Sequence, residues 1–219
     1  MKNKKLVIML LVMIVAVLAT GCFKNEKGPD SVQTPGTGEN EQKKELTVKD
    51  LYPLNEGDYW KFAGEGNEFA AYEQKVLFRE GDRVQLQVAS GGTVMGIIYE
   101  FTDGKLEVVY SQEEFYEEEN ILDRENQMSQ VILQEPIVVG NTWSSAGRNY
   151  KIEDVDATVE TPAGEFTGCV VISSTGDEDN VKNYVYYKPG LGLIKQEYVG
   201  PDYKIIAELE DFNVKTYNK

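Results

Sequence analysis

The chain has 219 residues, 41% of them hydrophobic and 27% charged, which is typical of one or two ordinary folded domains. Its formal net charge of −15 argues against a nucleic-acid partner, because binding to phosphates needs a basic surface. The sequence contains no His, which excludes Ser-His-Asp triads, His-ligated zinc sites and histidine pH switches.

The first 22 residues have the features of an export signal in their usual order. Lys2, Lys4 and Lys5 precede an uninterrupted apolar run, Leu6–Ala19. This run has the length of a signal-peptide core and is short for a transmembrane helix, which needs about 20 apolar residues. Residues 18–22 read Leu-Ala-Thr-Gly-Cys, an ending that resembles the lipobox of bacterial lipoproteins.

The lipobox resemblance implies that Cys22 is the lipidation site. A diacylglyceryl group on its sulfur, carrying fatty acids such as palmitate, would follow export, and residues 1–21 would be removed as the signal peptide. Two or three acyl chains hold a protein firmly, since each buried CH₂ contributes about 0.8 kcal/mol. We therefore expect a lipid-anchored protein on the extracytoplasmic face of a bacterial cell membrane. The alternative is cleavage nearby by an ordinary signal peptidase, with Cys22 incidental.

Residues 22–46 have the composition of a flexible tether. Between Phe23 and Glu45 polar residues, Gly and Pro predominate, and Val32 is the one aliphatic residue. Such a segment cannot bury a core, and as a coil it spans roughly 25–30 Å on average. Without the three Lys of the signal peptide the mature chain has a net charge of −18, so anionic lipid head groups repel it. We expect the folded domain to lie away from the bilayer.

From residue 47 to residue 219 the pattern is that of an antiparallel all-β domain. Alternation of apolar and polar residues, as in Val84–Val88, predicts strands with one buried face. In the next run Met95, Ile97, Tyr99 and Phe101 share one face. We expect ten or eleven strands, linked mostly as hairpins into a curved sheet or half-barrel.

Three short segments have the residues of particular turns. Asp103-Gly104 is a two-residue hairpin signal. Thr161-Pro162-Ala163-Gly164 suits a type I turn, and Lys188-Pro189-Gly190-Leu191 suits type II, in which the third residue has a positive φ. Each segment should join two antiparallel strands.

One segment of the domain occurs twice, at an offset of 83 residues. Pro53–Gly64 recurs as Pro136–Gly147, with seven equivalent positions that include both Trp residues of the chain, Trp60 and Trp143. We infer two tandem half-domains of about 80 residues, at about 50–118 and 133–212. The strand after each turn should bury its Trp in the core. The alternative is that the two Trp form an aromatic platform for sugars or another planar ligand.

The domain also resembles a known family. Pro53–Trp60, Thr161–Val171 and Tyr186–Lys195 look like segments of the TapB-like group of exported bacterial β-domains, many of which are lipoproteins. The likeness spans most of residues 50–212. It implies the fold and the exported location, and it implies no catalytic residue, because the family has no established activity.

The reactive residues form no enzyme signature. Cys169 lies in an apolar run and is expected to be a buried thiol, since a catalytic thiol needs a base and no His exists. The acidic segments 112–120 and 176–180 lack the spacing of a calcium loop, which favours a solvated connection and a hairpin tip. No P-loop, dinucleotide fingerprint, Cys-x-x-Cys or Gly-x-Ser-x-Gly occurs. We expect no catalytic, cofactor-binding or metal site, with a carboxylate-based hydrolase as the remaining enzymatic alternative.

Two functions from different classes remain. The first is a non-catalytic binding module that recognises a protein or cell-wall partner through an exposed sheet face or edge. The second is a carrier of an apolar or lipid ligand in the concave face of the sheet. Solid packing of Trp60, Trp143, Tyr99, Tyr186 and Phe101 would exclude the carrier, whereas a continuous apolar groove would favour it.

Overall fold

The computed structural model describes residues 45–176 and 181–217, so Cys22, the signal peptide and most of the tether lie outside the described residues. The elements are α1 (Val48–Leu51), β1 (Tyr59–Glu65), β2 (Tyr72–Glu80), β3 (Arg83–Ser90), β4 (Thr93–Thr102), β5 (Lys105–Gln112), β6 (Gln130–Gln134), β7 (Thr142–Ser145), β8 (Arg148–Thr161), β9 (Gly164–Gly176), β10 (Lys182–Lys188), β11 (Gly192–Val199) and β12 (Lys204–Asn213). No helix in this described part is long and apolar enough to cross a bilayer.

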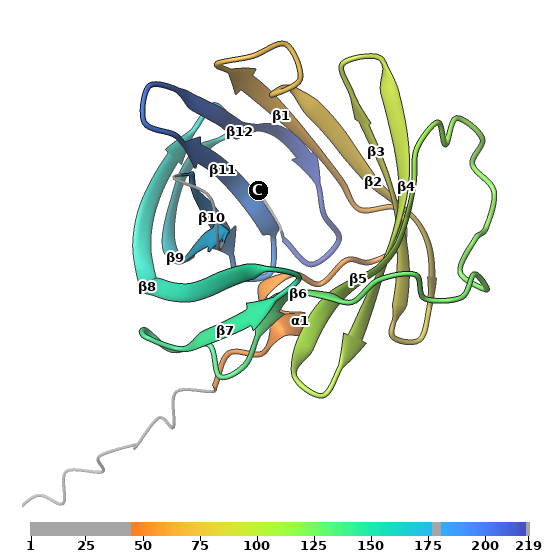
Figure 1. Cartoon of the computed structure of the whole chain (residues 1–219), viewed down its shortest axis with the longest axis horizontal. Helices are drawn as coiled ribbons and strands as arrows, with labels where there is room; N and C mark the ends of the chain where they lie inside the picture. Colours follow the sequence, from red (N-terminus) through yellow and green to blue (C-terminus); the bar gives the residue numbers. More distant parts are fainter. Residues whose placement is uncertain (1–44, 177–180, 218–219) are drawn as a thin grey trace, which may run out of the picture. The chain divides into compact units, whose positions relative to one another are not determined.

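The twelve strands form one antiparallel sheet that curves into a nearly closed, barrel-like ring (Figure 1). Their order is β6-β5-β4-β3-β2-β1-β12-β11-β10-β9-β8-β7, and β1 pairs with β12 in the middle. The expected all-β antiparallel class is confirmed. The expected curved sheet is also confirmed, but the expected number of ten or eleven strands is wrong, because the sheet has twelve. The outermost strands β6 and β7 have only five and four residues, too few for a visible alternation.

The two halves of the chain follow the same order around the ring. Strands β1–β6 run one after another, and β7–β12 do so in the same sense, so β1 lies six places from β7, β2 six places from β8, and so on to β6 and β12. The duplicated turn has matching backbone bonds: Gly57 N–H donates to the Val76 carbonyl (2.9 Å) and Gly140 N–H to that of Ile152 (2.8 Å). The half-domain limits stay a prediction, and β6 crosses the expected start of the second half at residue 133.

The turn also explains why the repeat tolerates either Asp or Asn at one position. In the first copy the Asp58 carboxylate accepts a hydrogen bond from the Asn55 backbone N–H at 2.7 Å. In the second copy the Asn141 side-chain amide donates to the Pro136 carbonyl at 2.9 Å. Each side chain fixes the same bend, one as an acceptor and the other as a donor.

The three turn predictions place the hairpins correctly. Asp103 and Gly104, both with positive φ, join β4 to β5, and residues 162–163 join β8 to β9. Between β10 and β11 the Leu191 N–H donates to the Lys188 carbonyl at 3.0 Å, and Gly190 has a φ of +79°. This geometry confirms the type II turn.

The two ends of the sheet meet at β6 and β7 without a backbone ladder between these described strands. Side chains hold this seam instead. The Val131 N–H donates to Ser145 Oγ at 2.8 Å, and the Trp143 indole N–H donates to the Val131 carbonyl at 3.0 Å. Both polar backbone groups of Val131 are thereby satisfied at a sheet edge.

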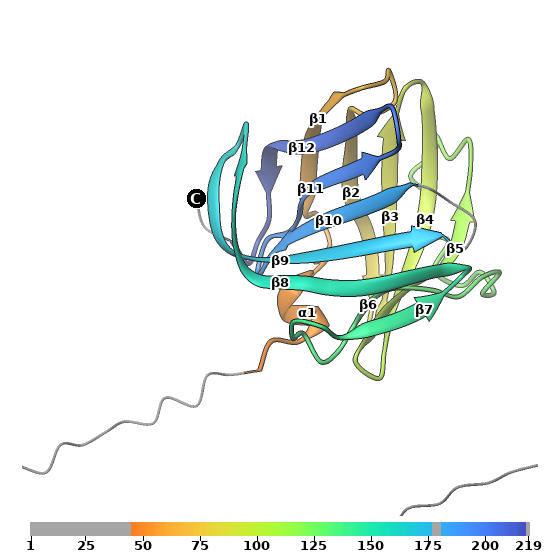
Figure 2. The same ribbon diagram turned by 60° about the vertical axis from the view of Figure 1, so that its left-hand side comes forward.

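The helix α1 closes one end of the ring (Figure 2). Its Val48 N–H donates to Glu135 Oε1 at 2.8 Å, and its Asp50 carbonyl accepts from the N–H of Gly190 at 2.7 Å. Glu135 and Gly190 follow β6 and β10, so both lie at the same end of the sheet. In a sheet of consecutive hairpins alternate turns lie at opposite ends, so the turns at 66–71, 91–92, 146–147 and 200–203 surround the other end.

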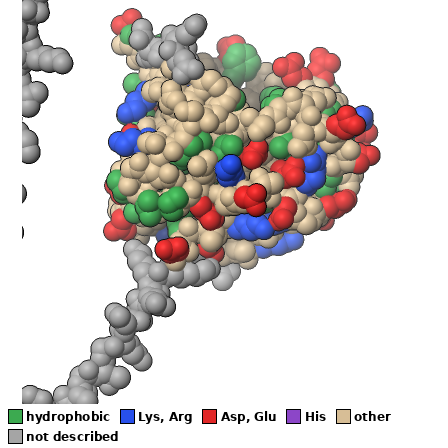
Figure 3. Space-filling model, turned by 60° about the horizontal axis from the view of Figure 1, so that its bottom comes forward, with side chains coloured by type: hydrophobic (Ala, Val, Ile, Leu, Met, Phe, Trp, Pro, Cys, Tyr) green, Lys and Arg blue, Asp and Glu red, His purple; other side chains and the backbone are tan. Residues whose placement is uncertain are grey.

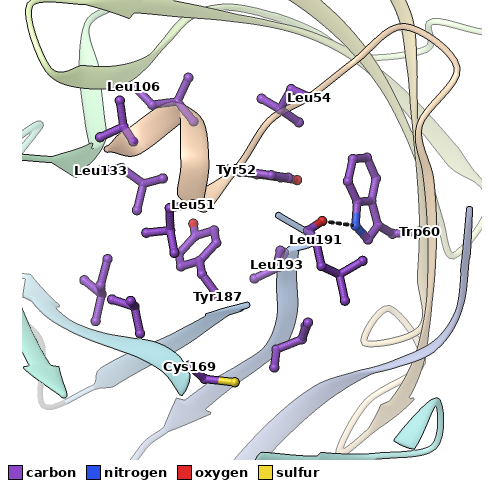
Figure 4. Close-up of a cluster of buried hydrophobic side chains, with 14 of the residues drawn as sticks. Leu51, Tyr52, Leu54, Trp60, Leu106, Leu133, Cys169, Tyr187, Leu191 and Leu193 are labelled. Carbon is purple, nitrogen blue, oxygen red and sulfur yellow. Dashed lines mark hydrogen bonds between the residues drawn. The ribbon is translucent and has the colours of Figure 1, made fainter. Parts of the chain in front are cut away.

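The main core lies next to α1. Leu51, Tyr52 and Leu54 are fully buried there with Leu106 and Leu133 (Figure 4). A second cluster is formed by Leu77, Ile98, Val109, Tyr110, Phe115, Ile121 and Leu122. It places buried side chains on the second face of β4, so the expectation of one buried face per strand is wrong for this strand.

The second face of β4 is buried because the connection between the two halves of the chain covers it. Residues 113–129 pack across β3 and β4, where the Gln85 side-chain amide donates to the Glu119 carbonyl (2.7 Å) and accepts from the Ile121 N–H (2.8 Å). The acidic residues of this segment are exposed, as expected of a solvated connection, but Phe115 is buried.

Candidate ligand cavity

The ring encloses a cavity of about 690 Å³, a volume typical of small-molecule sites. Residues from the segment after α1, from β2, β3, β4 and β6, and from β8 to β12 line it. The wall is therefore built by nearly the whole ring.

Tyrosines are the commonest residues of this wall. The described lining includes Tyr52, Tyr72, Tyr99, Tyr150, Tyr187 and Tyr198. Burial raises the pKa of Tyr99 to about 12, and it raises the pKa of Tyr187 well above the usual range. The Tyr99 and Tyr187 hydroxyls therefore stay protonated at neutral pH, and each of these side chains presents an aromatic body with a neutral polar tip.

The cavity carries little charge in a strongly acidic protein. Arg148 is the one charged residue in the described lining, and its guanidinium donates to Ser174 Oγ at 3.4 Å. Acidic and basic side chains instead cover the outside, as the face drawn in Figure 3 shows. Such an interior favours the neutral, apolar part of a ligand.

Polarity changes along the cavity. Near α1 the wall includes Tyr187, whose ring centroid lies 5.6 Å from that of Tyr52, and Val185. Asn183 precedes Tyr187 by four residues on β10, which is roughly 13 Å along a strand, and so lies toward the other end. Ser174 lies beside Asn183 on β9. The lining near α1 is mainly aromatic and aliphatic, with the Gln74 amide donating to the Tyr52 hydroxyl, and the lining at the other end combines polar residues with Phe69 and Ala70.

The predicted Trp anchors are confirmed. Trp60 is fully buried, and its indole N–H donates to the Leu191 carbonyl at 2.9 Å (Figure 4). Trp143 is also buried and stacks on Tyr150 with ring centroids 5.1 Å apart. Neither indole is available as the exposed platform that the alternative requires.

Solid packing of five aromatic residues was expected to exclude the carrier, but these residues do not all lie in one core. They are Trp60, Trp143, Tyr99, Tyr186 and Phe101. Phe101 is buried in the main core with both Trp, whereas Tyr99 lines the cavity. Tyr186 lies outside, where its hydroxyl donates to Glu197 at 3.1 Å. The inner-face expectation is therefore wrong for Tyr186, because strand alternation turns it away from its neighbours Val185 and Tyr187.

An ion-pair network surrounds Glu197 on this outer face. Lys195 Nζ lies 3.2 Å from Glu197 and 2.6 Å from Glu208, and Lys204 Nζ lies 2.9 Å from Glu197. Burial opposes ionisation of Glu197, but the hydrogen bonds from Lys204 and Lys195 outweigh it and hold the pKa of this carboxyl below its usual value. The network links β11 to β12.

The remaining candidate residues show no assembled chemistry. Cys169 is buried, its thiol donates to the Phe166 carbonyl at 3.3 Å, and burial raises its pKa to about 11, as expected of a thiol that packs as a small hydrophobe. Residues 177–180 of the second acidic segment lie outside the described residues. In the described ranges no three acidic or Cys side chains gather into a possible metal site.

Comparisons with known proteins give structural likenesses only. No family model and no curated sequence matches the chain. A candidate lipoprotein from Parabacteroides distasonis is 16% identical with a TM-score of 0.45, covering 74% of this chain and 97% of its own. A candidate exported protein with a YmcC-like fold from Bacteroides fragilis is 14% identical with a TM-score of 0.42, covering 74% and 98%. At these values neither likeness extends to function.

Proposed function

We propose that this protein is an exported bacterial lipoprotein, anchored through Cys22, that holds one apolar or amphiphilic molecule inside its sheet. The observation that carries the proposal is the cavity of about 690 Å³, closed by α1 at one end and lined by tyrosines and aliphatic side chains. This volume and lining suit a single lipid-sized ligand.

The cavity favours the carrier over the surface-recognition module. A barrel that serves only as a scaffold gains stability by filling its interior with side chains. Here the large aromatic residues Trp60, Phe101 and Trp143 pack in the core, and the space beside them stays unfilled. A module that binds a protein or wall polymer by its outer face has no use for that space.

We also propose that the protein acts without turnover. Catalysis at neutral pH usually needs a group that titrates near pH 7, such as a carboxylate or Lys in an unusual setting. Neither residue type lines the described wall of the cavity.

Dye displacement tests the carrier function. The mature chain with Cys22→Ala would be titrated with N-phenyl-1-naphthylamine, a neutral dye that fluoresces in apolar sites, and the dye would be displaced with monoolein. Ile97 and Val185 line opposite walls, on β4 and β10. The double variant Ile97→Trp, Val185→Trp should bind the dye at least tenfold more weakly.

The matched control places the same two Trp on exposed residues, Val138→Trp and Val139→Trp. It should bind the dye like the parent chain. Dye that binds equally to both double variants, or that monoolein fails to displace, would show that the interior is not the binding site.

Metabolic labelling tests the anchor. A bacterium given labelled palmitate should label the wild-type chain and leave Cys22→Ala unlabelled, because the lipid is attached through the Cys22 sulfur. Equal label on both chains would end the lipoprotein assignment.

A further inference from the structure

We propose that the ligand enters and leaves the cavity past Phe69, at the end of the ring opposite α1, and that the Phe69 side chain is the gate that sets the rate of exchange. The inference rests on the proposed carrier function. It adds the route of the ligand and the residue that controls it.

The other ways into the cavity are closed. At one end α1 packs in the main core, with Leu51 fully buried. Backbone ladders join all neighbouring strands of the described sheet except β6 and β7. Side-chain hydrogen bonds to both backbone groups of Val131 hold that seam, and the Gln130 amide donates from β6 to the Tyr150 hydroxyl on β8 at 2.9 Å. The end opposite α1 remains as the entrance.

The turn between β1 and β2 reaches into this entrance. Of the described turns that surround this end, it is the one whose own residues line the cavity, namely Asn67, Phe69 and Ala70. Ala70 is buried, and a Cβ on Gly64 of β1 would clash with the backbone of Ala70 and Ala71. The turn therefore folds back tightly on β1 and brings Phe69 to the rim of the cavity.

Phe69 lies between the interior and the solvent, since it lines the cavity and is also 55% exposed. Its backbone N–H donates to Asn67 Oδ1 at 2.9 Å, and its carbonyl accepts from Ser90 Oγ at 2.8 Å. Its ring lies against Gly91, where a Cβ would clash with it, so the ring spans from one turn to the next at this end. Because the backbone is held, rotation of the side chain is the motion that clears the entrance.

This rotation creates a barrier for the passing ligand. The ring is partly buried against Gly91, and moving it away exposes that apolar surface to water. Roughly half of the burial free energy of a Phe side chain corresponds to about a tenfold change in rate. A barrier on the path slows entry and exit by the same factor, so it changes both rate constants and leaves the dissociation constant as it was.

Stopped-flow fluorescence with N-phenyl-1-naphthylamine tests the gate on the mature chain with Cys22→Ala. Association is measured by mixing dye with the free chain, and dissociation by diluting the loaded chain into buffer. Phe69→Ala should raise both rate constants about tenfold and keep the dissociation constant within about twofold. Phe69→Tyr, which restores the ring, should exchange the dye at the rate of the parent chain.

Tyr116→Ala is the matched control. Tyr116 is 58% exposed and its hydroxyl lies 3.5 Å from the Gly92 carbonyl, beside the same turn, but it does not line the cavity. Ser145→Ala removes the acceptor of the Val131 N–H and so loosens the seam. Both variants should exchange the dye like the parent chain.

Three results would overturn the inference and leave the carrier intact. They are unchanged rates in Phe69→Ala, a rise in its dissociation rate constant alone, and a Ser145→Ala variant that exchanges the dye as fast as Phe69→Ala. A parent chain that binds no dye would instead refute the carrier function itself.

Discussion

Trp60 ties the duplicated turn to a distant part of the sheet. Its buried indole stands edge-on to Tyr52, with ring centroids 5.6 Å apart. The indole N–H donates a hydrogen bond to the Leu191 carbonyl in the turn between β10 and β11. Trp60→Ala would create a cavity and leave that carbonyl unpaired, so we expect a loss of about 3–5 kcal/mol in the free energy of unfolding. Urea denaturation measures it, with Tyr59→Ala as the partly exposed neighbour. If Trp60→Ala and Tyr59→Ala lower the free energy of unfolding by equal, small amounts, Trp60 is not a core anchor.

Cys169 should be chemically silent in the folded protein. Burial raises the pKa of its thiol to about 11, so the reactive thiolate is scarce at pH 8. In the mature chain with Cys22→Ala we expect Ellman's reagent to react with Cys169 about a hundredfold more slowly than after unfolding in urea. Reaction at the same rate in both states would show that the site opens readily.

The free energy of unfolding should depend on pH through Glu197, on the outer face of β11 and β12. Its pKa is lower in the folded protein than the unfolded value of about 4.3, so its stabilising effect is fully present above that value. The effect is lost as pH falls through the folded pKa. Urea denaturation between pH 6 and pH 3 should therefore show a smaller decline in the free energy of unfolding for Glu197→Gln than for the wild type.

Glu210→Gln is the matched control for this comparison. Glu210 pairs with Lys61 at 3.1 Å, but both side chains are exposed, and such pairs contribute little. We expect its pH dependence to follow that of the wild type. If the free energies of unfolding of Glu197→Gln and Glu210→Gln decline alike, the ion-pair network around Glu197 is not what responds to pH.

Hairpins were predictable where the turn chemistry is local. Asp103-Gly104 and Pro189-Gly190 need positive φ at particular residues, and that requirement is visible in the sequence. The direction of a side chain was not visible in the same way. Tyr99 and Tyr186 both lie a few residues before a Gly-containing turn, yet one lines the cavity and the other faces outward. Period two identifies two faces of a strand without saying which one is inside.

The cavity itself depends on the closure of the whole ring. The duplicated Trp motif predicted two copies of a turn, but the enclosed volume arises only when β1 joins β12 and the seam at β6 and β7 brings the ends together.

Native mass spectrometry of the mature chain with Cys22→Ala, incubated with monoolein, tests most directly whether the interior holds one lipid. The account predicts a single monoolein adduct that saturates at one per chain, and the same adduct on the variant with Val138→Trp and Val139→Trp. The variant with Ile97→Trp and Val185→Trp should carry none, because the added rings narrow the cavity from opposite walls. An adduct of equal abundance on that variant, or no adduct on the parent chain, would contradict the proposal of a lipid-binding interior.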